Sequence, residues 1–329
     1  MRTIAFFNNK GGVGKTSMVY HLAWMYAELN HRVLAVDLDP QSNLTSAFLD
    51  EDALDSLWEG EAQPQTILSA VQPLMDSLGD IVIPAPQAIT KNIMLLPGHL
   101  GLSRFEDRLG EAWSKCLDDN PANSGDGFRV MTAFHRIMQA VAERCGCDIV
   151  LVDVGPNVGA LNRAALVASD YLVVPLGADL FSLKGLTNLG PILRQWRDGW
   201  TKRKNEAPQI GISIPSGNME PIGYVLLNPS VRENRPVKAY EKWARRIPET
   251  YASSVLGQQY VPSIEDPNRL AMIKHFKSLM PMAQDARKPM FLLKAADGAI
   301  GGHASAVEEC YRQFKELAER ISARTKRGA

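Results

Sequence analysis

Residues 3–17 read Thr3-Ile4-Ala5-Phe6-Phe7-Asn8-Asn9-Lys10-Gly11-Gly12-Val13-Gly14-Lys15-Thr16-Ser17. The apolar start of this stretch predicts a buried strand, and a helical pattern runs from about Lys15 to Leu29. Glycines between the two elements allow several backbone N–H groups to face one anion, and the helix points the positive end of its dipole at the same place. A strand, a glycine-rich turn ending in Gly-Lys-Thr and a helix together predict a phosphate-binding loop, or P-loop.

The rest of the chain alternates short apolar runs with longer segments of helical periodicity. This alternation predicts parallel strands joined by crossover helices. Further strands are expected at residues 32–37, 93–96, 148–153, 171–174, 222–227 and 260–261. Helices are expected at about residues 128–145, 158–168, 183–204, 235–247 and 305–324. We therefore expect an α/β fold of the P-loop NTPase type, with a doubly wound, mostly parallel sheet flanked by helices.

The length of 329 residues suits one large domain with elaborations. Six prolines interrupt the stretch from Asp50 to about Gly127, which we expect to be an irregular insertion on a single P-loop ATPase domain spanning residues 1–329. A C-terminal helix at about residues 305–324 is expected to complete the domain.

The composition is that of a globular protein, with 36 Lys+Arg, 36 Asp+Glu and 45% hydrophobic residues. Residues 1–189 carry a net charge of −9 and residues 190–329 a net charge of +9. No apolar run approaches the roughly 18 residues of a membrane-spanning helix, and residues 1–9 lack a signal pattern. These features favour a cytoplasmic protein, in which the four cysteines would be free thiols.

The P-loop predicts which side chains bind nucleotide. Lys15 would supply a positive charge to the β- and γ-phosphates, and the Thr16 hydroxyl would bind Mg²⁺. The full set of expected nucleotide contacts in this loop is Lys10, Gly11, Gly12, Val13, Gly14, Lys15, Thr16 and Ser17.

Two further blocks place carboxylates after buried strands. Asp37 and Asp39 are two residues apart on an extended segment and would point the same way. The run Ile149-Val150-Leu151-Val152-Asp153 reads as a Walker B strand, whose Asp153 would accept a hydrogen bond from a metal-bound water. The metal ligands expected from these patterns, directly or through water, are Thr16 and Asp153.

The loop carries a second lysine, Lys10, five positions before Lys15. With this lysine the loop resembles that of the ParA/MinD family of deviant Walker A ATPases, and the Asp37-Leu38-Asp39-Pro40-Gln41 block is most similar to the short partitioning ATPases of the ParA type. The resemblance implies that Lys10 reaches the ATP of a partner across a nucleotide-sandwich dimer. It also implies that Asp39 positions the attacking water and that Asp37 helps to hold hydrated Mg²⁺. The catalytic residues expected are thus Lys10, Lys15 and Asp39.

The resemblance also bears on the base. The Asn-Lys-x-Asp motif of GTPases is absent, and Asn228 matches the residue that contacts the adenine edge in the family, so ATP with Mg²⁺ is expected. Val261-Pro262-Ser263 is similar to the loop that packs on adenine, which makes Pro262 a second candidate contact. The family usually continues Asp-x-Pro-Pro after the Walker B aspartate, whereas this chain has Gly155 before Pro156, which would make this loop more mobile.

A predicted helix at residues 235–247 carries cations at helical spacing. The stripe consists of Arg235, Lys238, Lys242, Arg245 and Arg246. Such a stripe on a positively charged segment suits sequence-independent binding to phosphates of DNA. Second-rank candidates are Lys202, Arg203, Lys204, Arg269, Lys274 and Lys277.

The resemblance to the ParA branch implies a homodimer on ATP binding, nonspecific DNA binding on the nucleoid, and a ParB-like or cargo-bound adaptor that stimulates slow ATP hydrolysis. The cargo would be a plasmid, a chromosome or another assembly. Three alternatives stay open: a MinD-like ATPase that docks on membrane through its last helix, a metal-cluster carrier using Cys145 and Cys147, and a P-loop ligase or kinase whose substrate pocket lies in residues 50–127.

Overall fold

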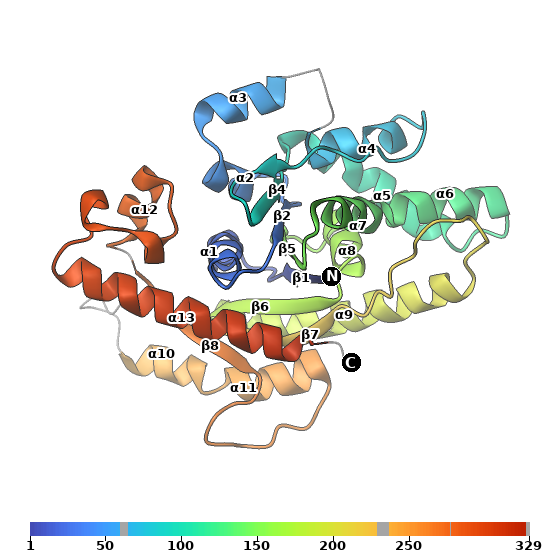
Figure 1. Cartoon of the computed structure of the whole chain (residues 1–329). Helices are drawn as coiled ribbons and strands as arrows, with labels where there is room; N and C mark the ends of the chain where they lie inside the picture. Colours follow the sequence, from blue (N-terminus) through green and yellow to red (C-terminus); the bar gives the residue numbers. More distant parts are fainter. Residues whose placement is uncertain (60–64, 229–236, 277, 327–329) are drawn as a thin grey trace.

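The computed structural model describes residues 1–59, 65–228, 237–276 and 278–326, which fold around one eight-stranded sheet (Figure 1). The strand order is β3-β4-β2-β5-β1-β6-β7-β8, and only β3 runs antiparallel to its neighbour. The strands are β1 (Arg2–Phe6), β2 (Val33–Asp37), β3 (Gln87–Ala88), β4 (Ile93–Leu96), β5 (Ile149–Asp153), β6 (Tyr171–Gly177), β7 (Glu220–Asn228) and β8 (Arg269–Lys274). The predicted α/β fold with a mostly parallel sheet is therefore confirmed.

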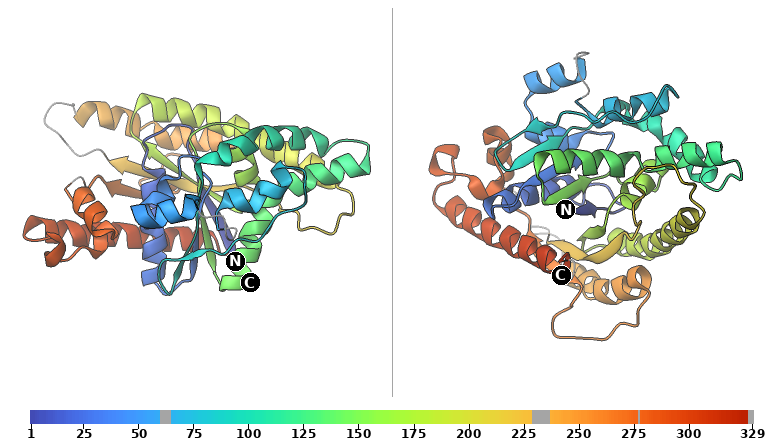
Figure 2. Two further views of the ribbon diagram at one scale, coloured as in Figure 1. Left: turned by 90° about the horizontal axis from the view of Figure 1, so that it is seen from above. Right: turned by 45° about the vertical axis from the view of Figure 1, so that its right-hand side comes forward.

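Helices cover both faces of this sheet (Figure 2). One core is closed by α4 (Ile67–Met75), α5 (Phe105–Lys115), α6 (Pro121–Met131), α7 (Ala133–Cys145), α8 (Ala160–Val167) and α9 (Leu180–Asn205). The other core is closed by α1 (Lys15–Glu28), α12 (Met280–Ala286) and α13 (Gly302–Arg324). The remaining helices are α2 (Asn43–Phe48), α3 (Glu51–Glu59), α10 (Val237–Ala244), α11 (Ile247–Thr250), the π-helix η2 (Tyr251–Leu256) and three 3₁₀ helices, η1 (Leu100–Arg104), η3 (Met290–Leu292) and η4 (Ala295–Asp297).

The strands alternate between the two cores residue by residue. In β1 and β2, Ala5 and Leu34 belong to the core under α4–α9, whereas Ile4 and Val33 belong to the core under α1 and α13. Because successive side chains of a strand point to opposite faces, a sheet covered on both sides needs continuous apolar strands. The uninterrupted apolar runs of the sequence meet this requirement.

Two helix predictions differ from the structure. The helix expected at residues 128–145 is divided at Thr132, whose hydroxyl donates to the Phe128 carbonyl at 2.7 Å, giving α6 and α7. The helix expected at residues 235–247 ends as α10 at Ala244, and Arg245 and Arg246 form a turn.

The strand expected at Tyr260-Val261 is wrong. Val261 is 74% exposed in the extended loop before β8, where it has no neighbouring strand to pair with. The edge strand is instead β8, whose sequence Arg269-Leu270-Ala271-Met272-Ile273-Lys274 buries Leu270, Ala271 and Ile273 but exposes Met272 and Lys274. Its charged ends obscured the strand pattern.

Residues 50–127 are more regular than expected where the structure describes them. They contain α3, α4, η1, α5 and part of α6, and they contribute β4 to the interior of the sheet. Proline begins α6 at its first turn, where no backbone N–H is needed, so this proline starts a helix and does not interrupt one.

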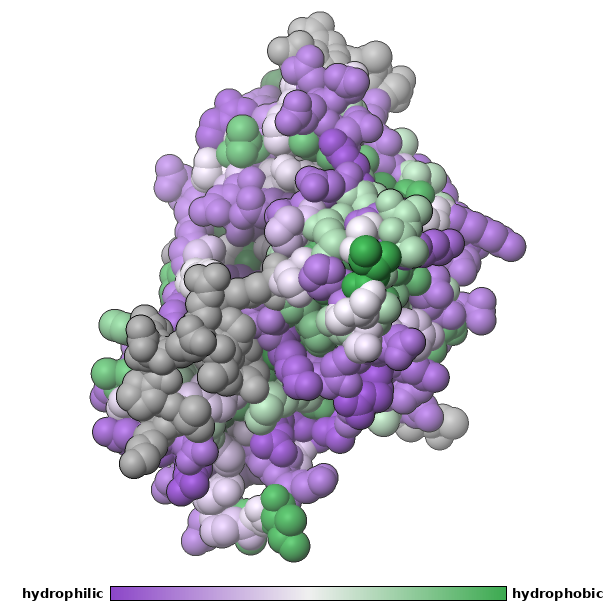
Figure 3. Space-filling model, turned by 90° about the vertical axis from the view of Figure 1, so that its left-hand side faces the viewer, coloured by the Kyte–Doolittle hydropathy of each residue, from purple (hydrophilic) through white to green (hydrophobic). Residues whose placement is uncertain are grey.

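The chain ends and the outer surface complete the fold. Arg2 donates to the Thr325 hydroxyl at 3.1 Å, so the start of β1 and the end of α13 are adjacent. On the side shown in Figure 3, a patch of hydrophobic residues interrupts a largely hydrophilic surface. Among the described residues, no helix has both the length and the apolar composition needed to cross a bilayer.

Candidate nucleotide site at the carboxyl edge of the sheet

Three neighbouring strands bring the predicted site residues together. Asp37 at the end of β2 is the register partner of Asp153 at the end of β5, and Asp153 is in turn the partner of Phe6 at the end of β1. The P-loop follows Phe6 directly. Both carboxylates therefore lie at the edge where α/β sheets bind ligands, beside the predicted phosphate loop.

The P-loop adopts a conformation that requires glycine. Gly12 and Gly14 have φ angles of 72° and 69°, in the left-handed region, and α1 begins at Lys15 immediately after Gly14. Asn8 fixes the start of the loop, because its Nδ2 donates to the Pro175 carbonyl at 2.6 Å and its Oδ1 accepts from the backbone N–H of Lys10 at 3.0 Å. The loop and the N-terminus of α1 together form an anion cradle.

The two lysines of this loop differ in their surroundings. Lys15 is buried, and burial lowers its pKa, while the charges of Asp153 and Asp39 act in the opposite direction. Lys10 is accessible, with 33% of its side chain exposed. Only Lys15 is thus enclosed within its own site.

Lys10 is held by a residue that we did not predict. Its Nζ lies 2.6 Å from Asp179 Oδ2 and 5.9 Å from the ring centroid of Phe181. Asp179 also caps α9 by accepting from the backbone N–H of Ser182 at 2.9 Å. The Asp-x-x-Ser spacing before the helix was a detectable cap signal, but only the pairing of β6 with β1 brings it to the P-loop.

Asp37 organises the loop after β2. Its Oδ2 accepts from the backbone N–H and the hydroxyl of Thr45 at 2.8 and 2.7 Å, and its Oδ1 accepts from the backbone N–H of Asp39 at 3.2 Å. Burial raises the pKa of Asp37 to about 6, although the Thr45 hydrogen bonds partly oppose this rise. Gly98 must be glycine here, since a Cβ would lie 2.9 Å from Asp37 Cγ.

Asp153 has a buried carboxylate whose two oxygens lack a hydrogen-bond partner within 3.5 Å among the described residues. Burial raises its pKa well above the usual value, Asp37 adds to the rise, and the neighbouring Thr16 hydroxyl and Lys15 reduce it. An unpartnered buried carboxylate beside Thr16 fits hydrated Mg²⁺, because this ion keeps several waters and needs few protein ligands. The Asp153 oxygens can therefore accept hydrogen bonds from bound water, whereas the Asp37 oxygens already accept from Thr45 and Asp39.

Asp39 lies next to the loop that follows β5. Its Oδ1 accepts from the backbone N–H of Gln41 at 3.0 Å, and a Cβ on Gly155 would lie 3.4 Å from the same oxygen. Asn162 of α8 ties this loop together, because its Nδ2 donates to the carbonyls of Gly155 and Asn157 at 2.8 and 2.6 Å. The departure from Asp-x-Pro-Pro thus places Gly155 beside a candidate catalytic carboxylate. Asn162 holds this loop in the structure, and its greater mobility stays a prediction.

The N-terminus of α8 is capped from another segment. Glu106 of α5 accepts from the backbone N–H groups of Ala160 and Leu161 at 2.5 and 2.8 Å. Gly159 leaves room for this carboxylate, since a Cβ there would lie 2.4 Å from Glu106 Oε1. Nothing in the sequence pattern linked residue 106 to residue 160.

The structure separates the two predicted adenine contacts. Asn228 ends β7 in register with Lys274, at the edge that holds the P-loop. The assignment of Pro262 is wrong, because its loop precedes the parallel strand β8 and therefore leads into the amino edge, opposite the P-loop. The missed strand β8 caused this error.

The DNA-binding candidates are only partly gathered. Lys242 and Arg246 lie 4.9 and 5.5 Å from the Trp243 ring centroid, and Arg245 Nη2 pairs with Glu241 at 3.4 Å. Arg235 and Lys277 lie outside the described residues, and Lys238 is in α10. Among the second-rank candidates, Lys202 is exposed and could contact DNA, whereas Arg269 is half-buried. Lys204 donates to the Ser216 carbonyl, and Lys274 pairs with Glu309.

Arg203 is a wrong DNA-binding candidate. It is buried, and its Nε donates to the Trp113 carbonyl at 2.6 Å. Its guanidinium stacks 3.8 Å from the Trp113 ring centroid, which makes it part of the packing between α5 and α9.

One alternative function loses support from the described residues. The apolar stripe of α13 is occupied inside the domain, with Cys310, Phe314, Leu317 and Ile321 all buried, and cannot at the same time contact lipid. Cys145 and Cys147 are free thiols.

Comparison with known proteins places the chain in a family. The sequence model described as "AAA domain" (AAA_31) matches residues 1–205. This chain belongs to the ParA/MinD family of P-loop ATPases. The chromosome partitioning protein ParA of Caulobacter vibrioides is 28% identical to this chain over 193 residues. The aligned part covers 57% of this chain and 61% of that protein. The match thus covers less than two thirds of the relative.

Solved structures share the fold of this ParA/MinD-family chain. Protein DIP2308 of Corynebacterium diphtheriae has a TM-score of 0.70 at 23% identity, covering 98% of each chain. The ATP complex of a variant of McdA from Cyanothece has a TM-score of 0.61 at 16% identity, covering 100% of this chain and 98% of that one.

Proposed function

We propose that this chain is a ParA-like positioning ATPase that binds ATP with Mg²⁺, dimerises on ATP and hydrolyses it to ADP and phosphate. The observation that carries the proposal is the contrast between the two P-loop lysines. Lys15 is enclosed beside Asp39 and Asp153, whereas Lys10 stays at the surface in a reversible ion pair. One lysine suits the nucleotide of its own protomer, and the other suits that of a partner.

Each protomer would hold the triphosphate with the backbone N–H groups of the P-loop and with Lys15. Thr16 would ligate Mg²⁺, and Asp153 would accept from its water, because both Asp153 oxygens are otherwise unsatisfied. A Mg²⁺ ion held there would supply positive charge that offsets the charge developing on the phosphates. Asp37 would act mainly by holding Thr45 and Asp39 in place.

Hydrolysis requires a water oxygen to attack the γ-phosphorus while the bond to the oxygen of the ADP leaving group breaks. We assign the positioning of this water to Asp39, which lies beside Gly155 and is attracted to Lys15. Phosphoryl transfer depends chiefly on positioning and charge neutralisation. A second protomer that contributes Lys10 would therefore complete the site and make turnover dependent on assembly.

The surface around Lys10 supports a protein interface. Phe181 and Leu180 at the start of α9 are 73% and 42% exposed, and Val158, in the loop after β5, is 45% exposed. Large exposed apolar side chains at one edge of a sheet are typical of contact surfaces. A partner protomer would cover them while Lys10 exchanges Asp179 for phosphate.

The test is light scattering with Mg-ATP, Mg-ADP or no nucleotide. The wild type should double its mass only with ATP, Lys10→Ala should stay monomeric while still binding ATP, and Lys15→Ala should lose nucleotide binding. Asp39→Ala should accumulate as an ATP-bound dimer. Lys91→Ala, at an exposed lysine without a partner among the described residues, is the control. An ATP-dependent dimer of Lys10→Ala would refute the assignment across the interface.

We further propose that the ATP-bound dimer binds DNA nonspecifically on the nucleoid and that an adaptor protein stimulates hydrolysis to position a cargo. Exposed Lys242, Arg245 and Arg246 support this proposal, because α10 follows β7, which ends at the nucleotide edge. We also propose that residues 1–329 form a single P-loop domain.

A further inference from the structure

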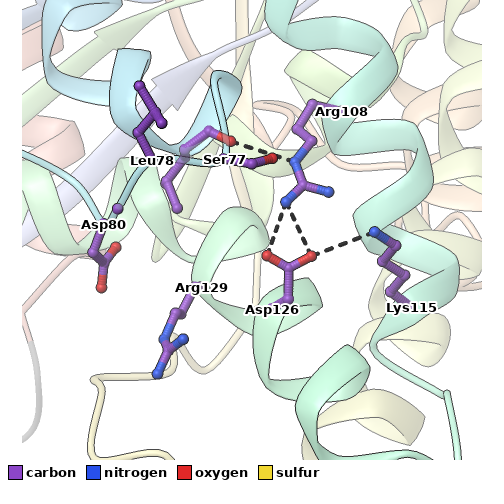
Figure 4. A pocket seen from close by; sticks show the side chains of 9 residues that line it. Ser77, Leu78, Asp80, Arg108, Lys115, Asp126 and Arg129 are labelled. Carbon is purple, nitrogen blue, oxygen red and sulfur yellow. Dashed lines mark hydrogen bonds and ion pairs between the residues drawn. The ribbon is translucent and has the colours of Figure 1, made fainter.

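A second pocket is built by the end of α4, the loop after it, α5 and α6 (Figure 4). Its volume is about 690 Å³. None of its lining residues belongs to the P-loop or to the segments around Asp37, Asp39 and Asp153. The pocket is therefore distinct from the proposed nucleotide site.

Two of its cations share one carboxylate. Arg108 Nη2 donates to both oxygens of Asp126 at 2.8 and 3.0 Å, and Lys115 Nζ donates to Oδ2 of the same residue at 3.4 Å (Figure 4). Arg108 is further fixed by donating from Nε to the Leu74 carbonyl at 3.4 Å. Arg108 Nη1 also lies 4.0 Å from Glu111 Oε2, so Asp126 and Glu111 together balance the charges of Arg108 and Lys115.

The third cation, Arg129, is exposed, and its guanidinium has no hydrogen-bond or ion-pair partner in the described parts of the chain. Figure 4 shows it apart from the Asp126 network. The nearby Asp80 is already neutralised from outside the pocket by Arg136, which forms two hydrogen bonds with it at 2.7 and 2.9 Å. With Arg108, Lys115 and Asp80 balanced in this way, the excess positive charge of the cavity is that of Arg129, which also attracts Asp80 electrostatically without forming an ion pair with it.

An apolar side chain lies beside these charges. Leu78 lines the pocket and is 84% exposed, whereas Leu74 on the same wall is buried. An occupant that satisfies both sides of the cavity must offer an apolar group to Leu78 and a carboxylate to Arg129.

We propose that this pocket binds a short acidic segment of a partner protein, with a carboxylate on Arg129 and an apolar side chain on Leu78. Duplex nucleic acid fits the pocket less well. The Arg108 side chain is only 16% exposed and is paired with Asp126, so the pocket offers few accessible cations to the regularly spaced phosphates of a duplex.

The location of the pocket gives such a segment a route to the nucleotide site. Arg108 and Lys115 lie on α5, the helix whose Glu106 caps α8. Binding at one face of α5 would shift the conformational equilibrium of the loop that contains Gly155. This regulatory step rests on the proposed ATPase function, whereas binding itself does not.

The binding test uses fluorescence anisotropy without nucleotide at fixed low salt. The probe is a fluorescein-labelled Glu-Asp-Leu-Glu-Asp-Leu peptide, with Gln-Asn-Leu-Gln-Asn-Leu as the neutral comparison. Arg129→Glu should weaken binding of the acidic probe at least about tenfold, Lys115→Gln should weaken it less, and the matched charge reversal Lys91→Glu should change it by less than about twofold. Circular dichroism establishes that each variant is folded.

Four outcomes would overturn the proposed site. These are no saturable binding by the wild type at millimolar peptide, equal binding of the neutral peptide, equal losses in Arg129→Glu and Lys91→Glu, and displacement of the peptide by random-sequence duplex DNA.

ATP turnover is then measured with the acidic peptide. A change of at least about twofold in the wild type but not in Arg129→Glu supports the regulatory step. Unchanged turnover with intact peptide binding refutes that step alone, and no turnover under any condition refutes the proposed ATPase.

Discussion

Two lysines of one loop have separate environments. Lys15 lies in a buried, partly acidic site, and Lys10 forms a partly exposed ion pair with Asp179. A partly exposed pair contributes at most about 1 kcal/mol, so a triphosphate can replace Asp179 without a large penalty. The position of Lys10 at the surface is therefore compatible with a role in a partner's site.

Asp179→Asn should strengthen ATP-dependent dimerisation, because Lys10 no longer has to leave a charged partner. Asparagine can still accept from the backbone N–H of Ser182, so the cap of α9 is retained. We expect the dimer to form at a protein concentration lower by up to about fivefold, measured by sedimentation in Mg-ATP. Asp198→Asn, at an exposed position of the same helix, is the control. A weaker dimer would instead place Asp179 within the interface.

At this scale the sequence predicted residue types well and partners poorly. The P-loop, Asp37, Asp39 and Asp153 follow from local patterns, and the register brings them to one edge. Asp179 was not predicted, because its contact with Lys10 joins residues 169 positions apart. The misplaced Pro262 shows the same limit, since the direction of β8 decides which edge its loop reaches.

Helix α8 depends on α5 for its N-terminal hydrogen bonds. Glu106 accepts from two backbone N–H groups of its first turn, and Asn162 then holds the carbonyls of the preceding loop. The region from residue 50 to 127, expected to be an irregular insertion, therefore supports the loop beside Asp39 through Glu106. Its helices could not be located from periodicity, because frequent prolines mask their boundaries.

Glu106→Ala should loosen the first turn of α8 and lower ATP turnover. The lost cap should cost about 1 kcal/mol, and the amides of residues 159–162 should exchange faster with deuterium. Glu106→Gln should restore part of the protection, since its amide oxygen can accept one hydrogen bond. Asp107→Asn, at an exposed neighbouring position, should leave exchange unchanged. Normal exchange in Glu106→Ala would exclude this positioning role.

The free energy of unfolding should depend on pH because His21 of α1 is buried in its neutral form. His21 Nδ1 donates to the Ser17 carbonyl at 2.6 Å, and its Nε2 accepts from the backbone N–H of Met290 at 3.2 Å, which fixes the neutral ring. Burial lowers its pKa from 6.5 to about 4, partly opposed by the Ser17 hydrogen bond. The unfolded state therefore binds more protons between these values, and stability present above pH 6.5 is lost as pH falls toward 4.

This loss should be on the order of 3 kcal/mol for the wild type. His21→Gln should be less stable at neutral pH but should have a flatter profile, measured by urea unfolding at several pH values. His275→Gln, at an exposed histidine, should retain the wild-type slope. A parallel profile for His21→Gln would assign the acid sensitivity to other groups.

The whole molecule encloses its sheet between two helical layers and divides its charge along the sequence, with −9 before residue 190 and +9 after it. The sequence predicted a mostly parallel sheet but not the order of its strands, because apolar runs indicate that a strand is buried but not which strands lie beside it. The continuous basic stripe was expected from one long helix. It is interrupted after Ala244, which leaves Lys242 and Arg246 around Trp243.

Replacing Lys242 and Arg246 by alanine together should weaken ATP-dependent binding to random-sequence duplex DNA. If each contacts one phosphate, the slope of log affinity against log salt should fall in magnitude by about 2. Anisotropy at several salt concentrations measures this slope. Lys91→Ala with Arg312→Ala removes two cations elsewhere and should leave the slope unchanged. An unchanged slope in the first pair would place DNA on another surface.

The adjacency of Arg2 and Thr325 has a consequence for detecting assembly in solution. β1 starts at the amino edge of the sheet and ends at the P-loop, so Arg2 and Thr325 lie on the side of the sheet opposite the proposed interface. Two protomers facing each other through their nucleotide edges would carry dyes at these ends on their outermost sides. Energy transfer between end-attached dyes should then be weak in the ATP state, whereas dyes at residue 181 should transfer strongly.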